Sequence, residues 1–360
     1  MAITKLSVDD FIAFANNHIV LDVRSEGEFN HAHIPNAYCL PLFNNDERKV
    51  VGTTYKQKSR ENAIKIGLEY FGPKMPIMIE TVESICKEKY GKSTGKETIL
   101  VHCWRGGMRS AGIAWLLDLY GFKVYTLIGG YKAYRNWVLE QFTKQYPIKI
   151  IGGYTGSGKT YVLNELEKKG LATIDIEGIA KHKGSAFGAI GMDIQPSQEM
   201  FENELAKALN VATENVTTNT LPYIFMEDES QRIGSVNIPK VLFEYMRKQT
   251  VYFLDIPFEE RLNHILNDYG KHPQTELVNA IVRIKKKLGG LDAKQAIGFL
   301  LEDDIKNCFA ILLKYYDKLY NIGLHKRQNV QEQVCTVVGS VVHANNNALA
   351  IMNALSANMH

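Results

Sequence analysis

The feature that most constrains the fold is a glycine-rich loop, GGYTGSGKT, at residues 152–160. The P-loop spacing GxxxxGK(S/T) is met here by Gly153, Gly158, Lys159 and Thr160. The apolar segment IKII precedes the loop, and the helix-forming segment TYVLNELEKK follows it. A strand that enters such a loop and leaves it as a helix is typical of a parallel sheet. The sequence therefore predicts a P-loop NTPase-like α/β domain.

This loop predicts a phosphate-binding site. Its glycines allow backbone N–H groups to face phosphate oxygens, the lysine reaches the terminal phosphate, and the threonine hydroxyl can ligate Mg²⁺. We predict that phosphates contact Gly153, Thr155, Gly156, Ser157, Gly158, Lys159 and Thr160. A carboxylate at the end of a neighbouring strand should complete the site. The segment FMEDES offers Glu227, Asp228 and Glu229, of which we choose Asp228.

The apolar segment ETILVHC leads into a second loop, HCWRGGMRS, with which it shares its last two residues. Arg105 and Arg109 bring positive charge toward Cys103, and the two glycines between them allow backbone N–H groups to face the sulfur. These effects, and the N-terminus of the following helix, favour the reactive thiolate. We predict Cys103, Arg105 and Arg109 as catalytic residues. The spacing C-x5-R is that of cysteine phosphatases, but the same cradle on the rhodanese fold carries sulfur or selenium as a persulfide or perselenide.

Composition excludes several classes of protein. The chain has 360 residues, a formal net charge of +3 and 45% hydrophobic residues, which is ordinary for a globular protein and neither demands nor excludes nucleic acid. No apolar run approaches the ~18 residues of a membrane span, so we expect a cytoplasmic protein with no membrane partner. The five cysteines are scattered and form no CxxC pair. A disulfide framework or structural zinc site is therefore not expected, and no metal ligands are predicted.

Strand and helix patterns divide the chain into three regions. Residues 1–145 alternate strands with helices around a polar, helical insertion at 44–96. Residues 146–257 continue from the P-loop through further strand–helix pairs. Residues 258–360 have helical patterns, and we interpret their tail, VVHANNNALAIMNALSANMH, as weakly specified. The prediction is an α/β protein with a helical C-terminal region that can pack on the P-loop domain.

The segment LDVRSEGEFNHAHIPNA resembles the rhodanese pattern of a DVR strand end, a glutamate-containing turn and a GHIPGA-like segment. The matching residues are Asp22, Arg24, Glu28, His33, Ile34 and Pro35, while Ala32 stands where glycine is usual. A rhodanese-like domain followed directly by a P-loop domain resembles the tRNA 2-selenouridine synthase family. The segments ERKVVGTTYKQ, HCWRGGMRS, GGYTGSGKT, HKGSAFG, QPSQEMFE and MEDES are also similar to that family.

The resemblance implies a tRNA-modifying transferase that acts on the wobble 2-thiouridine of certain tRNAs. A geranyl group from geranyl diphosphate is first attached to the 2-thio sulfur, and selenium from selenophosphate then replaces the geranylated sulfur. We expect the P-loop to hold the diphosphate, with Mg²⁺ as a candidate ion. Cys103 would carry selenium as a perselenide, while Arg105 and Arg109 hold selenophosphate. No tightly bound cofactor is implied, and the expected partners are the tRNA and a selenophosphate-supplying enzyme.

A tRNA partner requires a basic surface. Residues 261–360 carry 12 Lys and Arg against 8 Asp and Glu. The candidate contacts in the whole chain are Lys56, Arg60, Lys183, Arg283, Lys285, Lys286, Lys287, Lys326 and Arg327. Aromatic stacking on bases could come from Tyr315, Tyr316 and Tyr320, although tyrosines at this spacing more often pack in a core.

Other functions are compatible with the same residues. A Cdc25-like cysteine phosphatase fused to a P-loop kinase would hydrolyse a phosphoester through a phosphocysteine at Cys103, although the loop lacks an evident general acid. A non-catalytic P-loop switch with a rhodanese docking module would bind a nucleotide without needing Cys103. A protein that geranylates but does not selenate is a further alternative, because the selenium supply depends on other proteins.

Overall fold

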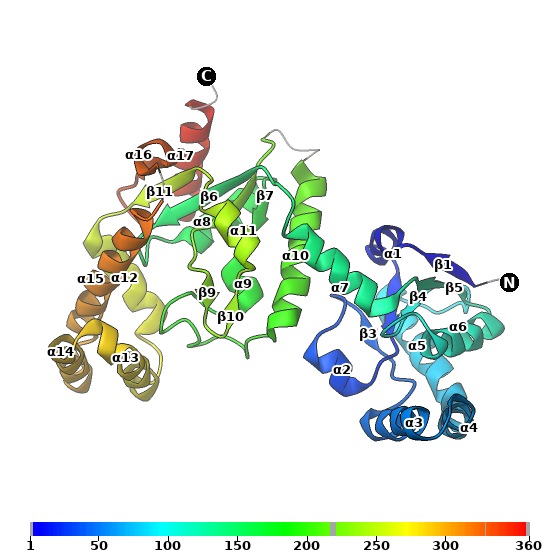
Figure 1. Ribbon diagram of the computed structural model, residues 1–360. Helices are drawn as coiled ribbons and strands as arrows, with labels where there is room; N and C mark the ends of the chain where they lie inside the picture. Colours follow the sequence, from blue (N-terminus) through cyan, green and yellow to red (C-terminus); the bar gives the residue numbers. More distant parts are fainter. Residues whose placement is uncertain (1–2, 217–220, 328, 358–360) are drawn as a thin grey trace. The chain divides into compact units, whose positions relative to one another are not determined.

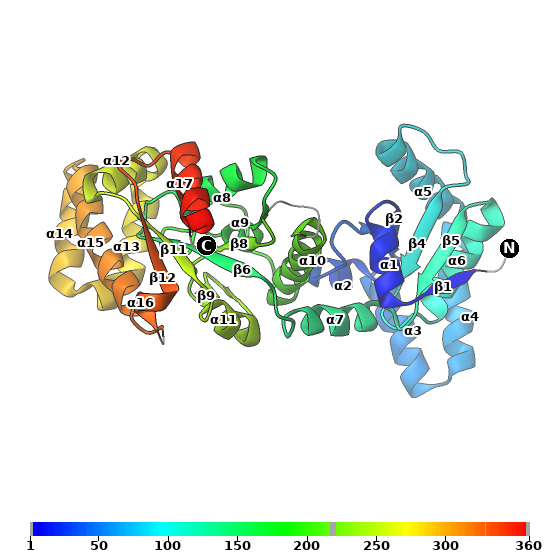
Figure 2. The ribbon, with the colours of Figure 1, turned by 90° about the horizontal axis from the view of Figure 1, so that it is seen from above.

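The computed structural model describes residues 3–216, 221–327 and 329–357. The chain divides into two compact units, Met1–Glu140 and Gln141–His360, each built on its own parallel sheet (Figures 1 and 2). The region from residue 258 onward thus forms one unit with the P-loop domain. No helix in the described part of the chain is long and apolar enough to cross a membrane.

The first unit contains a five-stranded parallel sheet in the order β1-β5-β4-β2-β3. Its strands are β1 (Thr4–Leu6), β2 (Ile19–Asp22), β3 (Tyr38–Cys39), β4 (Thr98–His102) and β5 (Lys123–Leu127). Its helices are α1 (Val8–Ala15), α2 (Glu26–His31), α3 (Asn45–Gln57), α4 (Arg60–Phe71), α5 (Met75–Tyr90), α6 (Met108–Tyr120) and α7 (Gly130–Gln141), with a 3-10 turn at Gly72–Lys74. The central strands β2 and β4 are buried on both faces, as their uninterrupted apolar runs predict. The insertion at 44–96 is helical, as predicted.

A buried ion pair lies at the carboxyl end of β2. The Arg24 guanidinium donates to both carboxylate oxygens of Asp22, at 2.6–3.0 Å, and to the Ala32 carbonyl oxygen at 2.7 Å. It also stacks on the Tyr131 ring, 3.8 Å from the ring centroid. Both charged side chains are at most 2% exposed. The DVR segment therefore has a structural role, because it ties the loop after β2 to the start of α7.

Replacing Asp22 by alanine is expected to lower the free energy of unfolding of the first unit by about 3–5 kcal/mol, because the buried Arg24 loses its counter-charge. The measurement is a urea titration followed by tryptophan fluorescence. It reports on this unit alone, since all three tryptophans, Trp104, Trp115 and Trp137, lie within it.

The matched control is Asp46→Ala at the exposed start of α3, where a change of at most about 1 kcal/mol is expected. Equal unfolding midpoints for the two variants would contradict the assigned role of the Asp22–Arg24 pair.

The second unit contains a five-stranded parallel sheet in the order β12-β11-β6-β8-β7 and a small hairpin, β9-β10. Its strands are β6 (Ile148–Gly153), β7 (Ala172–Ile174), β8 (Ile224–Glu227), β9 (Arg232–Ile233), β10 (Val236–Asn237), β11 (Val251–Asp255) and β12 (Val334–Val338). Its helices are α8 (Lys159–Lys168), α9 (Ile176–Ala180), α10 (Gln198–Val216), α11 (Lys240–Met246), α12 (Phe258–Tyr269), α13 (Gln274–Leu288), α14 (Gly290–Leu301), α15 (Ile305–Leu324), α16 (Val330–Gln333) and α17 (Ala344–Ala357). The strand that carries the P-loop, β6, lies in the middle of this sheet.

The C-terminal region is mostly helical, as predicted, and α12–α15 gather into a bundle at one end of the unit (yellow to orange in Figure 1). The interpretation of the tail as weakly specified is wrong. Helix α17 lies within that tail and buries Ala348, Ile351 and Leu355 in the core that contains α8. Residues 358–360 of that tail lie outside the described residues. Just before the tail, where helical patterns were expected, strand β12 pairs in parallel with β11. Its β-branched run VCTVV was the available signal for this edge strand.

Candidate active site

The P-loop joins β6 to α8, as predicted from its spacing. Gly153, Gly156 and Gly158 have φ angles of +149°, +80° and +79°, which residues with a side chain rarely adopt. A Cβ atom on Gly156 would also lie 2.8 Å from the Ile265 Cδ1 atom of α12. The glycines are therefore needed both for the curvature of the loop and for its close packing on α12.

The two polar residues at the start of α8 face the inside of the loop. The Lys159 ammonium donates to the Gly153 carbonyl oxygen at 3.0 Å. The Thr160 hydroxyl donates to the Glu227 carboxylate at 2.6 Å. One Glu227 carboxylate oxygen, Oε2, is buried and has no hydrogen-bond partner within the described chain. The carboxylate that pairs with the P-loop threonine is thus Glu227.

The choice of Asp228 for this position is corrected by its contacts. The Asp228 carboxylate accepts hydrogen bonds from the Arg327 guanidinium at 2.6 Å and from the Tyr320 hydroxyl at 2.7 Å. The same Tyr320 hydroxyl accepts from the Gly153 backbone N–H at 3.1 Å. The adjacent carboxylates, Glu227 and Asp228, therefore contact different partners, and Asp228 supports the loop through α15.

Two further glutamates extend the polar end of the site. Burial, followed by the charge of Glu229, raises the pKa of Glu177 to about 9, so this side chain holds a proton at neutral pH. Burial raises the pKa of Glu229 to about 7, although Lys159 opposes the shift. Glu177 lies on α9 and was not among the predicted site residues. The N-capping Asp175 before Ile176 was the signal for that short helix.

The bundle helices hold the loop through a second buried ion pair. Arg261 of α12 forms two hydrogen bonds with the Asp317 carboxylate, at 2.9 and 2.8 Å, and donates to the Thr155 carbonyl oxygen at 3.0 Å. The preceding residue of the loop, Tyr154, donates through its hydroxyl to Asn321 at 2.9 Å. Helix α15 thus contacts the P-loop through Tyr320 and Asn321, while its Asp317 holds the arginine that contacts Thr155. The C-terminal region is therefore part of the site.

A cavity of about 1030 Å³, called the P-loop cavity below, opens beside these residues. Its polar lining includes Thr155, Gly156, Gly158, Lys159, Thr160, Asp175, Glu177, Lys183, Asp228 and Glu229. Its apolar lining includes Phe187, Met192, Ile265, Tyr269, Phe309, Leu312, Leu313, Tyr316 and Leu319. Phosphate-binding and apolar surfaces therefore face one space, in which a ligand with an anionic head and an apolar tail fits.

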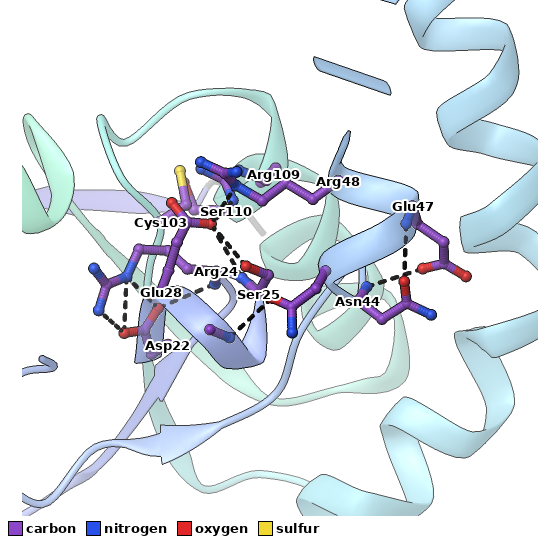
Figure 3. A network of polar contacts seen from close by, with 12 residues as sticks. Asp22, Arg24, Ser25, Glu28, Asn44, Glu47, Arg48, Cys103, Arg109 and Ser110 are labelled. Atoms are coloured by element: carbon purple, nitrogen blue, oxygen red, sulfur yellow. Dashed lines mark hydrogen bonds and ion pairs between the residues drawn. The ribbon is translucent and has the colours of Figure 1, made fainter. Parts of the chain in front are cut away.

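The cysteine loop follows β4 in the first unit. Figure 3 shows Cys103 beside Ser110, with Arg109 and Arg48 close by. The Cys103 sulfur lies 3.2 Å from the Ser110 hydroxyl oxygen, and the cysteine is 3% exposed. Gly106 has a φ angle of +65°, and a Cβ atom there would lie 2.6 Å from the Leu127 carbonyl oxygen. The loop can therefore curl around the sulfur only with glycine at that position.

Glu28 orients the arginines of this loop. Its carboxylate accepts from the Arg109 guanidinium at 2.9 Å and pairs with Arg48 at 2.8 Å. Arg48 belongs to α3, in the helical insertion, and its side chain is 51% exposed. Arg105 is exposed as well. The structure thus brings a third arginine to the cysteine loop, which the sequence analysis missed because no local spacing connects α3 to Cys103.

The surroundings of Cys103 lower the pKa of its thiol, whereas those of Cys39, Cys86 and Cys308 raise it. Burial alone would raise the pKa of Cys103, but hydrogen bonds from Ser110 and from the Arg105 backbone, together with the Arg109 charge, bring it below its ordinary value. In contrast, burial raises the pKa of Cys39 to about 11 and that of Cys308 to about 12. This environment favours the thiolate at Cys103.

Replacing Ser110 by alanine is expected to raise the pKa of Cys103, because the thiolate loses a hydrogen-bond donor. Only the thiolate is alkylated, so the pH dependence of the alkylation rate should shift to higher pH, and the rate at pH 7 should fall. Alkylation of the Cys103 peptide by iodoacetamide, followed by mass spectrometry, measures this. Ser84→Ala on the exposed side of α5 is the control. An unchanged pH profile for the Ser110 variant would contradict the assigned hydrogen bond.

The predicted tRNA contacts differ in their exposure. Exposed side chains are found at Lys56, Arg60, Arg283, Lys285, Lys286, Lys287 and Lys326. Arg327 is removed from this group, because its side chain is 1% exposed and paired with Asp228. Lys183 lines the P-loop cavity, where it lies 3.6 Å from the Asp268 carboxylate.

The tyrosines proposed for base stacking are mostly internal. Tyr316 lines the P-loop cavity and accepts a hydrogen bond from the Ala186 backbone N–H at 3.0 Å. Tyr320 is held between Asp228 and the P-loop. These two residues therefore have roles within the cavity wall and the loop support, and a contact of Tyr315 with RNA stays a prediction.

The described part of the chain contains no group of three or more His, Cys, Asp or Glu side chains arranged to hold a metal ion. The Thr160 hydroxyl and the unpartnered Glu227 oxygen nevertheless offer two hard oxygen ligands beside the P-loop. Mg²⁺ is usually bound by one or two protein oxygens together with substrate phosphates, so the residues fit that ion.

Two family models match the sequence, one in each unit. A model described as "Rhodanese-like domain" matches residues 7–136, and one described as "tRNA 2-selenouridine synthase AAA domain" matches residues 146–344. The predicted rhodanese-like domain is thereby confirmed, and so is the separate domain that carries the P-loop.

Curated relatives resemble the chain over most of its length. A protein named tRNA 2-selenouridine synthase from Hydrogenovibrio crunogenus is 32% identical over 354 residues, covering 89% of this chain and 93% of the relative. Proteins of the same name from Bdellovibrio bacteriovorus and a Sulfurovum species are 32% and 30% identical and cover 87% and 88% of this chain, respectively. The matches cover 91% and 93% of these two relatives, so the similarity extends across both units.

Proposed function

The chain belongs to the tRNA 2-selenouridine synthase family, which is a family of enzymes, and on this premise we propose that it converts wobble 2-thiouridine in tRNA to 2-selenouridine through an S-geranylated intermediate. Geranyl diphosphate and selenophosphate are the proposed co-substrates. The P-loop unit would perform the geranyl transfer, and the cysteine loop would perform the selenium transfer.

The observation that supports geranyl transfer, the first step, is the composition of the P-loop cavity. A nucleoside triphosphate and geranyl diphosphate both have a phosphate head, but only the second has a wholly apolar tail. The apolar side chains that line the cavity beside the P-loop favour the second. A volume of about 1030 Å³ is at the upper end for a ligand site, so a nucleobase can enter together with the isoprenoid.

The proposed geranyl transfer is a substitution at C1 of the geranyl group. The 2-thio sulfur forms a bond to C1 while the bond from C1 to the diphosphate oxygen breaks, and diphosphate leaves with the electron pair. Lys159 and the backbone N–H groups of the loop would stabilise the leaving diphosphate. Thr160 and Glu227 would hold Mg²⁺, which would supply further neutralisation of that charge. Alkylation converts the sulfur into a better leaving group for the second step.

For the second step we propose that Arg109, Arg105 and Arg48 bind the selenophosphate anion beside Cys103. The thiolate would attack the selenium atom while the selenium–phosphorus bond breaks, so that Cys103 carries selenium as a perselenide and the phosphorus group leaves with the bonding electron pair as phosphite. The terminal selenium would then form a bond to C2 of the geranylated base as geranyl thiolate leaves, and a thiol reductant would cleave the sulfur–selenium bond to release 2-selenouridine. Glu28 would hold Arg109 and Arg48 in place until the anion arrives. Arg48 extends the proposed anion site beyond the two arginines of the loop itself.

The same environment argues against the alternative of a phosphatase. A phosphatase of this type needs a general acid that protonates the leaving group. Although burial opposes the shift, Arg109 and Arg48 keep the pKa of Glu28 below its ordinary value, so this carboxylate is ionised at neutral pH. Burial lowers the pKa of His102 to about 4, so this side chain is neutral. Neither group beside the loop is suited to the role. The non-catalytic alternative is set aside because the family is enzymatic.

The proposed function is tested by mass spectrometry of nucleosides from 2-thiouridine-containing tRNA. One reaction contains the protein, Mg²⁺ and geranyl diphosphate, and a second also contains selenophosphate and a thiol reductant. We expect S-geranylated 2-thiouridine in the first reaction and 2-selenouridine in the second. A third reaction replaces geranyl diphosphate by ATP and should leave the nucleoside unchanged. Unchanged 2-thiouridine in all three reactions would contradict the proposal.

A further inference from the structure

Three aromatic side chains meet at the apolar part of the P-loop cavity. Phe187 lies in the loop between α9 and α10, Tyr269 ends α12, and Phe309 lies on α15. Their ring centroids are 5.6–6.0 Å apart in all three pairs, and each residue is at most 9% exposed. We call these three residues the aromatic wall.

The aromatic wall separates the cavity from the core of the helical bundle. All three rings belong to the bundle core, together with Leu277 and Ile281 of α13 and Ala296 of α14. The rings line the cavity, whereas those residues of α13 and α14 do not. The space therefore stops at the rings, because close-packed side chains lie behind them.

The distance from the P-loop to the aromatic wall follows from two helices. On α12, Arg261 contacts the P-loop and Tyr269 belongs to the wall. On α15, Asp317 pairs with that arginine and Phe309 belongs to the wall. Each pair is eight positions apart in sequence. At a rise of ~1.5 Å per residue, each helix places the wall about 12 Å from its contact at the loop.

This length falls between those of two common isoprenoid chains. With carbon–carbon bonds of ~1.5 Å in a zigzag, the eight-carbon main chain of a geranyl group extends about 9 Å. The twelve-carbon main chain of a farnesyl group extends about 14 Å on the same basis. The first fits between the P-loop and the wall, and the second does not unless it folds back.

We propose that Phe187, Tyr269 and Phe309 set the length of the isoprenoid chain, so that the P-loop cavity accepts a ten-carbon diphosphate in preference to a fifteen-carbon one. This inference rests on the proposed function. Phe309 is the residue to change, because it contacts both other rings and its backbone is fixed within α15. The Lys183 ammonium, which also lines the cavity, lies 5.2 Å from the Tyr269 ring centroid, so a cation lies beside the wall.

The experiment compares kcat/KM for geranyl and farnesyl diphosphate on 2-thiouridine-containing tRNA. The variants are Phe309→Ala and Phe309→Leu. The alanine variant removes most of the wall at this position, whereas the leucine variant fills more of the core and so is expected to stay folded. The control is Phe299→Leu, since Phe299 packs on the same bundle core but does not line the cavity. Circular dichroism spectra establish that each variant is folded.

We expect the wild-type protein and Phe299→Leu to prefer geranyl diphosphate. The farnesyl-to-geranyl ratio of kcat/KM should increase by about tenfold or more in at least one Phe309 variant, in line with the effect of matching a hydrophobic pocket to chain length. An unchanged ratio in folded Phe309 variants that still transfer geranyl would overturn the inference but leave the proposed function standing. Failure of the wild-type protein to transfer any isoprenoid would overturn both.

Discussion

Replacing Cys103 by serine is expected to reduce 2-selenouridine formation by about 10³-fold or more, while S-geranylated tRNA accumulates. A serine hydroxyl is not ionised at neutral pH and cannot form a perselenide. The P-loop cavity is unchanged, because Cys103 and the P-loop belong to different compact units. Nucleoside mass spectrometry of reactions with geranyl diphosphate and selenophosphate measures both products.

The control for this prediction is Cys39→Ser. Cys39 is also near the carboxyl end of the first sheet, but burial raises the pKa of its thiol to about 11, so the control should make 2-selenouridine at the wild-type rate. If Cys103→Ser makes 2-selenouridine as fast as the control does, the cysteine has no role in selenium transfer. Selenophosphate would then act directly on the geranylated base.

The Lys159→Ala variant is expected to lose geranyl transfer but to keep selenium transfer. Geranyl transfer should fall by about 10²–10³-fold, because the leaving diphosphate loses the cation that stabilises its developing charge. When S-geranylated tRNA is supplied, the same variant should still form 2-selenouridine with selenophosphate. Initial rates from nucleoside mass spectrometry, with each of the two tRNA substrates, measure the separation of the two steps.

Lys168→Ala is the matched control, because this lysine lies on the same helix with its side chain 73% exposed. Loss of both steps in Lys159→Ala would mean that the P-loop also serves selenium transfer. Retention of geranyl transfer would contradict the binding of diphosphate at the P-loop and would favour a nucleotide as the P-loop ligand.

The parts of the site that depend on local spacing could be predicted from the sequence. The P-loop requires glycine at Gly153, Gly156 and Gly158 for reasons of backbone conformation, and these requirements act within a few residues. The same holds for Cys103, whose nearest stabilising groups, Ser110 and the Arg105 backbone, lie in its own loop. Such features are visible in any sequence that contains them.

The parts that depend on packing could not be predicted. Arg48 lies in the helical insertion and meets Glu28 only in the folded structure, and no spacing in the sequence encodes that contact. The assignment of Asp228 failed because neighbouring carboxylates at a strand end contact different partners, and the tertiary structure decides which one meets Thr160. Arg327 was predicted to be a surface charge, but its side chain is buried and forms an ion pair with Asp228.

Helix α15 connects the P-loop to the aromatic wall at the far end of the P-loop cavity. Tyr320 and Asn321 hold the P-loop directly, Asp317 holds it through Arg261, and Phe309 lines the far end of the cavity on the same helix. Because a helix of 20 residues moves largely as a rigid rod, a tail that presses on Phe309 also displaces the residues that hold the phosphate loop. We therefore expect an oversized isoprenoid diphosphate to be misaligned at its reacting carbon even after it binds, so that discrimination would be expressed in turnover as well as in affinity.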